Sequence, residues 1–132
     1  MEVRSFEPDD LHGVLRLCEA EGWPSFPADA ARALRILTAP GVTTVVAVDN
    51  GGVVGFAELF SDGELQAFLA NLAVDSAKRG AGIGRQLVAE ALRQAGGERV
   101  DLLSEEDAAG FYRTFANFEK PGFRLYPFYE GG

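Results

Sequence analysis

A glycine-rich turn between an apolar strand and an amphipathic helix constrains this chain more than any other feature of its sequence. The apolar run Leu72-Ala73-Val74 leads toward the turn, which contains Gly80, Gly82 and Gly84. The helix that follows has apolar residues on one face, beginning at Ile83, and polar residues on the other. Helix N-termini carry unpaired N–H groups and partial positive charge, and glycines let the backbone approach an anion closely. The turn is therefore a predicted phosphate-binding site.

Three basic residues flank this turn in a chain that is otherwise acidic. Lys78, Arg79 and Arg85 surround the glycines, and no acidic residue lies between Lys78 and Gln86, although the formal net charge of the chain is −8. The overall charge excludes general binding to nucleic acid or to an anionic membrane, because both would repel the protein. The turn is the local exception that an acidic protein needs in order to hold an anion.

Two well-known phosphate-binding motifs do not fit the turn. A P-loop requires Lys-Ser or Lys-Thr after its last glycine, whereas Gly84 is followed by Arg85-Gln86. The dinucleotide-binding fingerprint requires a third glycine three positions after the second, and those positions hold Arg85 or Leu87. Both motifs are excluded, so the turn belongs to another class of anion-binding loop.

Apolar periodicity and turn signals predict a single domain over residues 1–132, of α/β (α+β) class, with the order β-α-α-β-β-β-α-β-α-β. Asn50-Gly51 predicts a tight hairpin, and the helix after the glycine turn should place the strands on either side of it parallel. The predicted strands are residues 3–6, 42–48, 53–60, 65–74, 100–103 and 122–129. The predicted helices begin near Leu11, at Ala28, at Ile83 and near Glu105.

The pattern Arg79-x-x-Gly82-x-Gly84, at the junction of an apolar strand and an amphipathic helix, resembles the acetyl-CoA-binding motif of the GCN5-related N-acetyltransferases, the GNAT family. The resemblance implies an N-acetyltransferase that uses acetyl-CoA as cosubstrate. In such an enzyme a primary amine attacks the thioester directly, and no metal is needed.

The rest of the chain supports the same resemblance. Its element order is similar to that of the family, with a mixed central sheet and a shortened C-terminal strand region. Asp9-Asp10-Leu11 resembles the start of the family's first helix. Phe111-Tyr112 followed by Gly122-Phe123 resembles its C-terminal motif.

The resemblance also implies which residues bind the cofactor. Backbone N–H groups of the glycine turn would hold the pyrophosphate, and the strand before it would pair with the pantetheine arm. A backbone donor on that strand, the N–H of Leu72, would stabilise the oxyanion that forms on the thioester carbonyl. The implied cofactor-binding residues are Leu72, Ala73, Val74, Arg79, Gly80, Ala81, Gly82, Ile83, Gly84 and Arg85.

Two catalytic roles are implied by the resemblance. Tyr112 matches the family tyrosine that protonates the departing thiolate, although its position on an apolar stripe with Phe111 also fits a core aromatic. Some family members carry a glutamate base on the central strand, where this chain has Phe68-Leu69-Ala70. Glu58 on the preceding strand is the predicted general base, acting through water. Asn71 can position a water but cannot act as a base.

The resemblance places the amine acceptor between the loop after the first helix and the C-terminal strands. Trp23, Phe26 and Tyr126 lie in these segments and are the predicted acceptor-binding residues. Aromatic side chains in an acidic protein suit a cationic small-molecule or peptide amine with an apolar body. For Trp23 and Phe26 the alternative is that they cover the core.

The chain is short at its C-terminal end relative to the family. The segment Arg113–Pro121 is longer than the usual helix end, so too little chain remains for two full strands. The family's last strand is then missing, very short, or supplied by a partner subunit. Aromatic residues from Phe123 to Tyr129 suit a homodimer through the C-terminal strand, an acceptor pocket, or simple edge-strand packing.

Cysteine content and hydropathy predict a cytoplasmic protein without a membrane partner. The lone Cys18 cannot form an internal disulfide, and one His with one Cys excludes a Cys/His zinc cluster. No stretch approaches the ~18 consecutive apolar residues of a membrane span. The first residues, Met1–Phe6, lack the pattern of a signal peptide.

One other class of function remains open. A non-catalytic module that binds or senses acyl-CoA would have the same fold and the same glycine turn. The absence of a glutamate at Phe68-Leu69-Ala70 and the short C-terminal end are compatible with it.

Overall fold

The computed structural model describes residues 1–128, and the chain divides into two compact units. The first unit is Met1–Leu102 and the second begins at Leu103. The first unit contains the sheet and the three longer helices. The expectation of a single domain stays a prediction.

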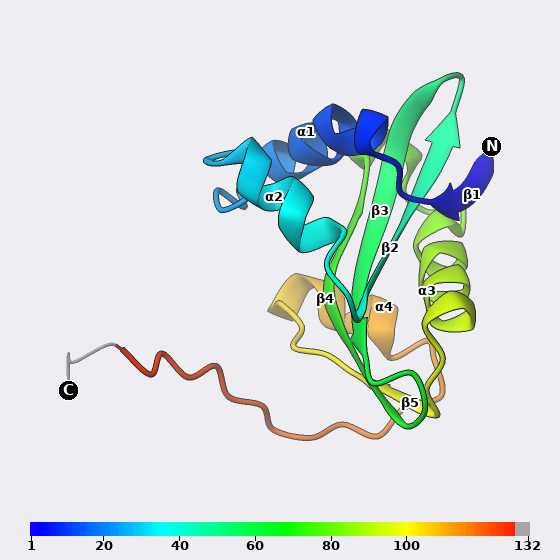
Figure 1. Cartoon of the computed structure of the whole chain (residues 1–132). Helices are drawn as coiled ribbons and strands as arrows, with labels where there is room; N and C mark the ends of the chain where they lie inside the picture. The colour runs from blue at the N-terminus through cyan, green and yellow to red at the C-terminus, as the bar shows by residue number, and fades with distance from the viewer. Residues whose placement is uncertain (129–132) are drawn as a thin grey trace. The chain divides into compact units, whose positions relative to one another are not determined.

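The first unit is built on a five-stranded sheet with the order β1-β2-β3-β4-β5 (Figure 1). Neighbouring strands are antiparallel except for β4 and β5, which run parallel as predicted. The β2–β3 hairpin turns at Asn50-Gly51, where both residues have positive φ, which confirms the turn expected from this dipeptide. The strands are β1 (Glu2–Ser5), β2 (Val42–Asp49), β3 (Gly52–Ser61), β4 (Gln66–Val74) and β5 (Arg99–Asp101).

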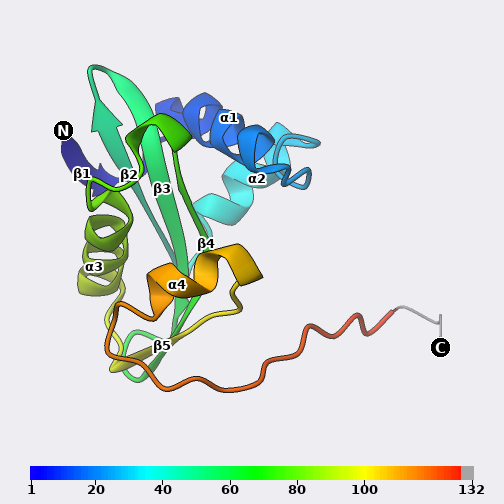
Figure 2. The same ribbon diagram turned by 180° about the vertical axis from the view of Figure 1, so that it is seen from behind.

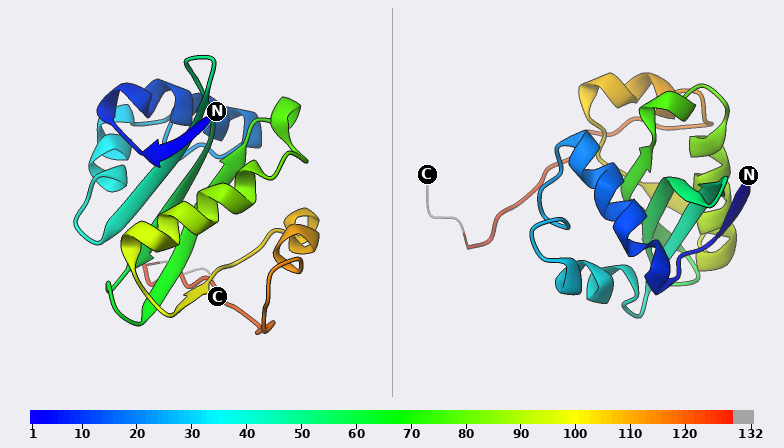
Figure 3. Two further views of the ribbon diagram at one scale, coloured as in Figure 1. Left: turned by 90° about the vertical axis from the view of Figure 1, so that its right-hand side faces the viewer. Right: turned by 90° about the horizontal axis from the view of Figure 1, so that it is seen from above.

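Helices cover both faces of this sheet. The helices are α1 (Leu11–Glu21), α2 (Ala30–Leu37) and α3 (Ile83–Ala95). Figure 3 shows α1 and α2 on one face and α3 on the other. α1 ends at Gly22 and α3 at Gly96, and both glycines are helix C-caps with positive φ. The predicted α/β class with a mixed sheet is also confirmed.

Two apolar layers hold the helices on the sheet. On the α1 and α2 face, Val14, Leu37 and Phe56 are almost completely buried in one cluster with Cys18. On the opposite face Leu87 of α3 is fully buried. Leu87 packs so closely over Gly55 that a Cβ added at Gly55 would lie 2.9 Å from Leu87 Cδ1. Burying these side chains contributes about 1.5–3 kcal/mol each to the folded state.

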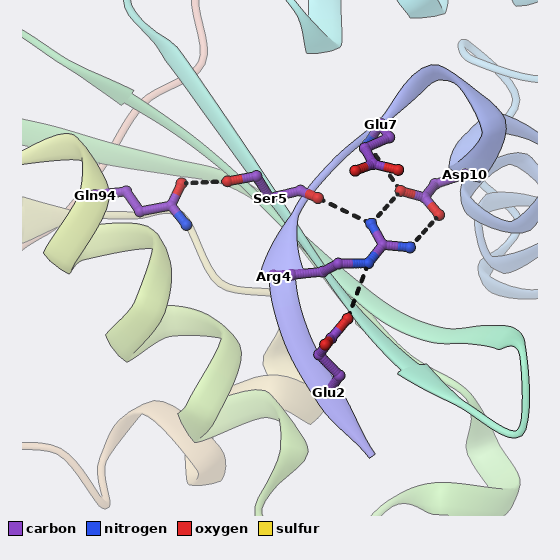
Figure 4. Close-up of polar contacts among 6 residues, drawn as sticks. All are labelled: Glu2, Arg4, Ser5, Glu7, Asp10 and Gln94. Atoms are coloured by element: carbon purple, nitrogen blue, oxygen red, sulfur yellow. Dashed lines mark hydrogen bonds and ion pairs between the residues drawn. The ribbon is translucent and has the colours of Figure 1, made fainter.

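A charged network ties β1 to the start of α1 (Figure 4). Two guanidinium nitrogens of Arg4 donate to the two carboxylate oxygens of Asp10, at 2.8 and 3.0 Å. Asp10 also accepts a hydrogen bond of 2.8 Å from the backbone N–H of Glu7. In the same view Ser5 donates to the side chain of Gln94 on α3, at 3.1 Å. The short strand β1 is thereby connected to helices of both layers.

The second unit contains one short helix followed by chain without regular structure. A 3-10 turn at Glu106–Ala108 leads into α4 (Ala109–Tyr112), and the ring of Phe111 packs edge-to-face against Tyr112 and Phe115 at 5.0 and 5.3 Å. The helix ends at Tyr112, before Phe115.

The strand predicted over residues 122–129 is wrong for the described part of that range. Residues 113–128 contain no helix or strand, and Tyr129 lies outside the described residues. The side chains of Phe123 and Phe128 are 82% and 98% exposed. An aromatic-rich pattern favours a strand only where a neighbouring strand accepts its backbone hydrogen bonds and buries its side chains. This segment has neither within residues 1–128.

Within residues 1–128, no helix has the length and apolar character needed to cross a membrane.

Candidate active site

The glycine turn begins where β4 leaves the sheet (Figure 2). The backbone N–H of Asp75 donates to the carbonyl of Val54 at 2.8 Å, which holds the end of β4 against β3. The Asp75 carboxylate then accepts from the N–H of Ala77 at 2.9 Å and caps a 3-10 turn over Ser76–Lys78. This local capping turns the chain out of the sheet and toward α3.

Gly80 and Gly82 shape the segment between that turn and α3. Their φ angles are 84° and 82°, a left-handed conformation that other residues adopt only with strain. No atom lies within 4 Å of a Cβ built on either glycine. Gly82 is the N-cap of α3 and offers no side chain to cap its N–H groups. The turn therefore presents an uncapped helix N-terminus beside open space.

Lys78 and Arg79, at the start of the turn, form ion pairs with carboxylates. Lys78 Nζ lies 3.2 Å from Asp49 Oδ2 at the β2–β3 hairpin. Arg79 forms an ion pair with Glu21 at the end of α1, and its Nε donates to the carbonyl of Val74 at 3.2 Å. Arg85 lies on an exposed part of α3. The sequence gives no signal for these pairings, because each joins residues from distant segments of the chain.

The strand before the turn has a partly unpaired edge. β5 pairs with β4 only along Gln66–Phe68, and β4 continues to Val74. Within the first unit no other strand pairs with the outer edge of β4 beyond Phe68. The expected pantetheine-binding residues Leu72, Ala73 and Val74 lie in this stretch, with Ala73 buried and the other two partly exposed.

Glu58 is a buried carboxyl group on the α1 side of β3. Its side chain is 1% exposed, and Oε1 accepts a hydrogen bond of 2.7 Å from Asn71 Nδ2 on β4. Oε2 has no hydrogen-bond partner in the described part of the chain. Burial raises the pKa of Glu58 above its ordinary value, and the hydrogen bond from Asn71 opposes this rise. Such a carboxyl group holds a proton to higher pH than an exposed glutamate does.

The predicted acceptor-binding residues lie in different parts of the chain. Trp23 and Phe26 are partly buried and pack against the core cluster beneath α1 and α2. Tyr126 lies in the second unit, with its side chain 66% exposed. Tyr112, the predicted acid, is also in the second unit and is half-buried beside Phe111. Of the predicted site, the first unit thus holds the glycine turn, the edge of β4, Glu58, Trp23 and Phe26.

No group of three or more His, Cys, Asp or Glu side chains within residues 1–128 is arranged to hold a metal ion.

Comparison with known proteins identifies the family to which this fold belongs. A family model described as an acetyltransferase (GNAT) domain matches residues 40–116, more than half of the chain, from the start of β2 to beyond α4. The matched range includes the glycine turn, Glu58, Asn71 and Tyr112. The chain belongs to the GNAT acetyltransferase family, as the motif at Arg79–Gly84 predicts.

Solved structures with the same fold cover nearly the whole chain. A protein of Agrobacterium tumefaciens, named as an inferred acetyltransferase, is 31% identical with a TM-score of 0.80, over 96% of this chain and 99% of its own. An acetyltransferase of Trypanosoma brucei is 25% identical with a TM-score of 0.75, over 94% and 97%. The aminoglycoside N-acetyltransferase AAC(6')-Iy, solved with CoA, shares the fold at 21% identity and a TM-score of 0.76, over 96% and 94%. Among curated proteins no sequence matches the chain.

Proposed function

We propose that this protein is an acetyl-CoA-dependent N-acetyltransferase that transfers the acetyl group to a primary amine. The observation that carries the proposal is the uncapped N-terminus of α3 at Gly82, placed directly after the partly unpaired strand β4 in a GNAT acetyltransferase. The CoA complex of AAC(6')-Iy, which has the same fold, supports the choice of cosubstrate.

The glycine turn fits the pyrophosphate of coenzyme A. Gly80 and Gly82 leave open space where other residues would carry a Cβ, and α3 is long enough, at 13 residues, to present a helix dipole. We assign the phosphates to the backbone N–H groups from Arg79 to Arg85. Bound there, acetyl-CoA would supply an acetyl group activated as a thioester.

The outer edge of β4 is suited to the pantetheine arm. Leu72, Ala73 and Val74 lie in the part of β4 that β5 leaves unpaired, so backbone hydrogen bonds are available to an extended ligand. We assign the N–H of Leu72 to the carbonyl oxygen of the thioester, where a backbone donor stabilises developing negative charge.

Glu58 and Tyr112 would move the protons of the reaction. The acceptor ammonium loses one proton through water to Glu58 Oε2, which has no other partner in the described residues. The neutral amine then forms a bond to the acetyl carbon while the carbon–sulfur bond breaks. Tyr112 gives a proton to the leaving thiolate, and the proton released from the new amide nitrogen returns to Tyr112 through solvent.

A binding assay and a turnover assay together test the proposal. Acetyl-CoA should raise the melting temperature, and a panel of primary amines should include one that releases coenzyme A, measured with a thiol reagent. Cys18 is buried and should react slowly with that reagent. An N-acetyl product survives hydroxylamine, whereas a thioester or an activated ester does not.

Each outcome of these assays has one interpretation. Stabilisation without thiol release for any amine, from pH 6 to 9, would favour the non-catalytic binding module. No stabilisation by acetyl-CoA would contradict both the enzyme and the module.

The acceptor-binding residues and the partner subunit belong to the same proposal. We propose Trp23 and Phe26 of the first unit, and separately Tyr126 of the second, as residues that bind the acceptor, a small-molecule or peptide amine. Phe118, Phe123, Tyr126 and Phe128 are 66–98% exposed. Exposed apolar side chains gathered in one segment are typical of interaction surfaces, and this supports a homodimer through the C-terminal segment.

A further inference from the structure

The pairing of Glu58 with Asn71 depends on a bulge in the sheet. In the antiparallel β3–β4 ladder Leu59 lies opposite Leu69, and Glu58 lies opposite Asn71. Ala70 is the extra residue of this bulge. In a regular ladder Ala70 would lie opposite Glu58, and Asn71 would point to the other face of the sheet. The bulge is therefore what places an amide donor beside this buried carboxylate.

The hydrogen bond from Asn71 makes the two carboxylate oxygens of Glu58 different. Oε1 is 2.7 Å from Asn71 Nδ2, and Oε2 has no partner in the described residues. The amide of Asn71 fixes the plane of the carboxylate, because turning the group out of this plane would break the bond. The oxygen left unbonded is the one that can take up a proton.

The other groups that face Glu58 do not compete with Asn71. Thr44, opposite Glu58 on β2, donates its hydroxyl to the carbonyl of Leu37 at 2.8 Å. The group on α1 that interacts electrostatically with Glu58 is the Cys18 thiol, whose pKa is raised to about 11, chiefly by burial and further by the charges of Glu58, Glu21 and Glu19. This thiol stays neutral at physiological pH, and no charged side chain of residues 1–128 shifts the pKa of Glu58.

We propose that Asn71 is a positioning residue for proton transfer, which holds Glu58 by Oε1 and reserves Oε2 as the proton acceptor. This inference rests on the proposed function, in which Glu58 acts as the base through a water molecule. The proton moves from the acceptor ammonium to that water, and from the water to Oε2. After transfer the neutral carboxyl group releases the proton to solvent, while Asn71 keeps its bond to Oε1.

The pH dependence of the variant Asn71→Ala tests this role. The bond from Asn71 stabilises the carboxylate and lowers its pKa, so its removal should raise the pKa of Glu58. Because the base must be ionised, the acid limb of the kcat/KM profile should move to higher pH by about one unit. The matched control is Gln66→Ala on the same strand, whose amide donates to the carbonyl of Ala67 at 2.8 Å and not to Glu58. Its acid limb should not move.

A second background separates positioning from a structural role. Glu58→Gln should lower kcat strongly and remove the acid limb. In that background Asn71→Ala should leave the pH profile unchanged, although it still removes a hydrogen bond. If Asn71→Ala lowered stability without moving the acid limb in the Glu58 enzyme, Asn71 would be structural only and the proposal would be overturned.

A measurement without cosubstrate keeps the inference apart from the proposed function. The Glu58 carboxyl carbon can be titrated by NMR in the protein alone, with Glu58→Gln used to assign its signal. Its midpoint should be about one pH unit higher in Asn71→Ala than in the unmodified chain. An inactive enzyme with this shift would contradict the proposed function and leave the positioning of Glu58 intact. An active enzyme with no shift, in either the titration or the acid limb, would contradict the inference alone.

Discussion

At the scale of single residues, Asp10 is a buried carboxylate held by three hydrogen bonds. Its two oxygens meet two nitrogens of Arg4, and this arrangement lowers the pKa of Asp10 below its ordinary value, chiefly through the Arg4 hydrogen bonds. A carboxylate with a lowered folded-state pKa stabilises the fold at pH values above its unfolded pKa. This contribution is lost as the pH falls through the folded-state pKa.

Asp10→Asn should therefore destabilise the protein at neutral pH more than in acid. We expect a loss of about 2 kcal/mol at pH 7, because a charged, bidentate interaction is replaced by a neutral one. The difference from the unmodified chain should shrink below about pH 4. Urea unfolding at pH 7 and pH 3 measures both values. Asp9→Asn, an exposed neighbour, is the control, and equal losses in the two variants would contradict the role of the Arg4 pair.

Gly82 is the residue on which the proposed coenzyme A site depends most directly. In Gly82→Glu a carboxylate would fill the open space beside the N-terminus of α3 and repel phosphate, so stabilisation by coenzyme A should disappear. The matched control is Gly51→Glu, because Gly51 has a similar φ of 77° and no atom within 4 Å of an added Cβ. Both variants should lose about 1–2 kcal/mol of stability from left-handed strain.

A thermal-shift titration with coenzyme A distinguishes these two glycine variants. Only the Gly51 variant should keep the shift. If the Gly82 variant bound coenzyme A with unchanged affinity, the phosphate site would lie elsewhere.

At the scale of elements, α3 packs closely on β3 because the large side chain of Leu87 lies over Gly55. Gly55→Ala would place a Cβ 2.9 Å from Leu87 Cδ1 and 3.1 Å from the carbonyl oxygen of Ala73, and should cost about 1–3 kcal/mol. Leu87→Ala should cost about 2–5 kcal/mol, because it leaves a cavity in the core. The double variant should lose less than the sum, since the new methyl group occupies part of the vacated space. Strictly additive losses in chemical denaturation would show that the two residues do not contact each other.

The sequence allowed most of these elements to be predicted. The Asn50-Gly51 hairpin, the amphipathic helix after the glycine turn and the parallel pair β4–β5 all follow from local patterns, and the structure has them. The bulge at Ala70 has no local signal, because it is a property of the ladder between two strands. The prediction of a C-terminal strand was wrong for a related reason, because a strand requires a neighbouring strand as well as favourable residues.

The position of the glycine turn between β4 and α3 was predictable from residues close together in sequence, and the structure has it there. Its role in cofactor binding stays a proposal. The contacts of Arg79 with Glu21, and of Asn71 with Glu58, join segments whose proximity only the folded chain decides. The exposed C-terminal aromatic side chains bear on the assembly of the whole molecule.

At that scale, a homodimer through the C-terminal segment should be broken by changes in that segment alone. The combined substitution of Phe118, Phe123 and Phe128 by Ser should convert a dimer to a monomer, measured by sedimentation at several protein concentrations. The unfolding midpoint extrapolated to low concentration should hardly change, because these side chains are 82–98% exposed. Leu65→Ser, at an exposed position in the first unit, is the control and should leave the mass unchanged. A monomeric unmodified chain at all concentrations would contradict the proposed dimer.

The two buried carboxyl groups should give the whole protein a bounded pH range of maximal stability. Asp10 has a lowered pKa and stabilises the fold only above the acid range, whereas Glu58 has a raised pKa and destabilises it increasingly as the pH rises through its folded-state value. In urea unfolding at pH 8, the free energy of unfolding of Glu58→Gln should therefore exceed that of the unmodified chain by about 1–3 kcal/mol. This difference should disappear at pH 4. The unbonded oxygen of Glu58 therefore costs folding free energy whenever the carboxyl group is ionised, and this cost accompanies its proposed use as a base.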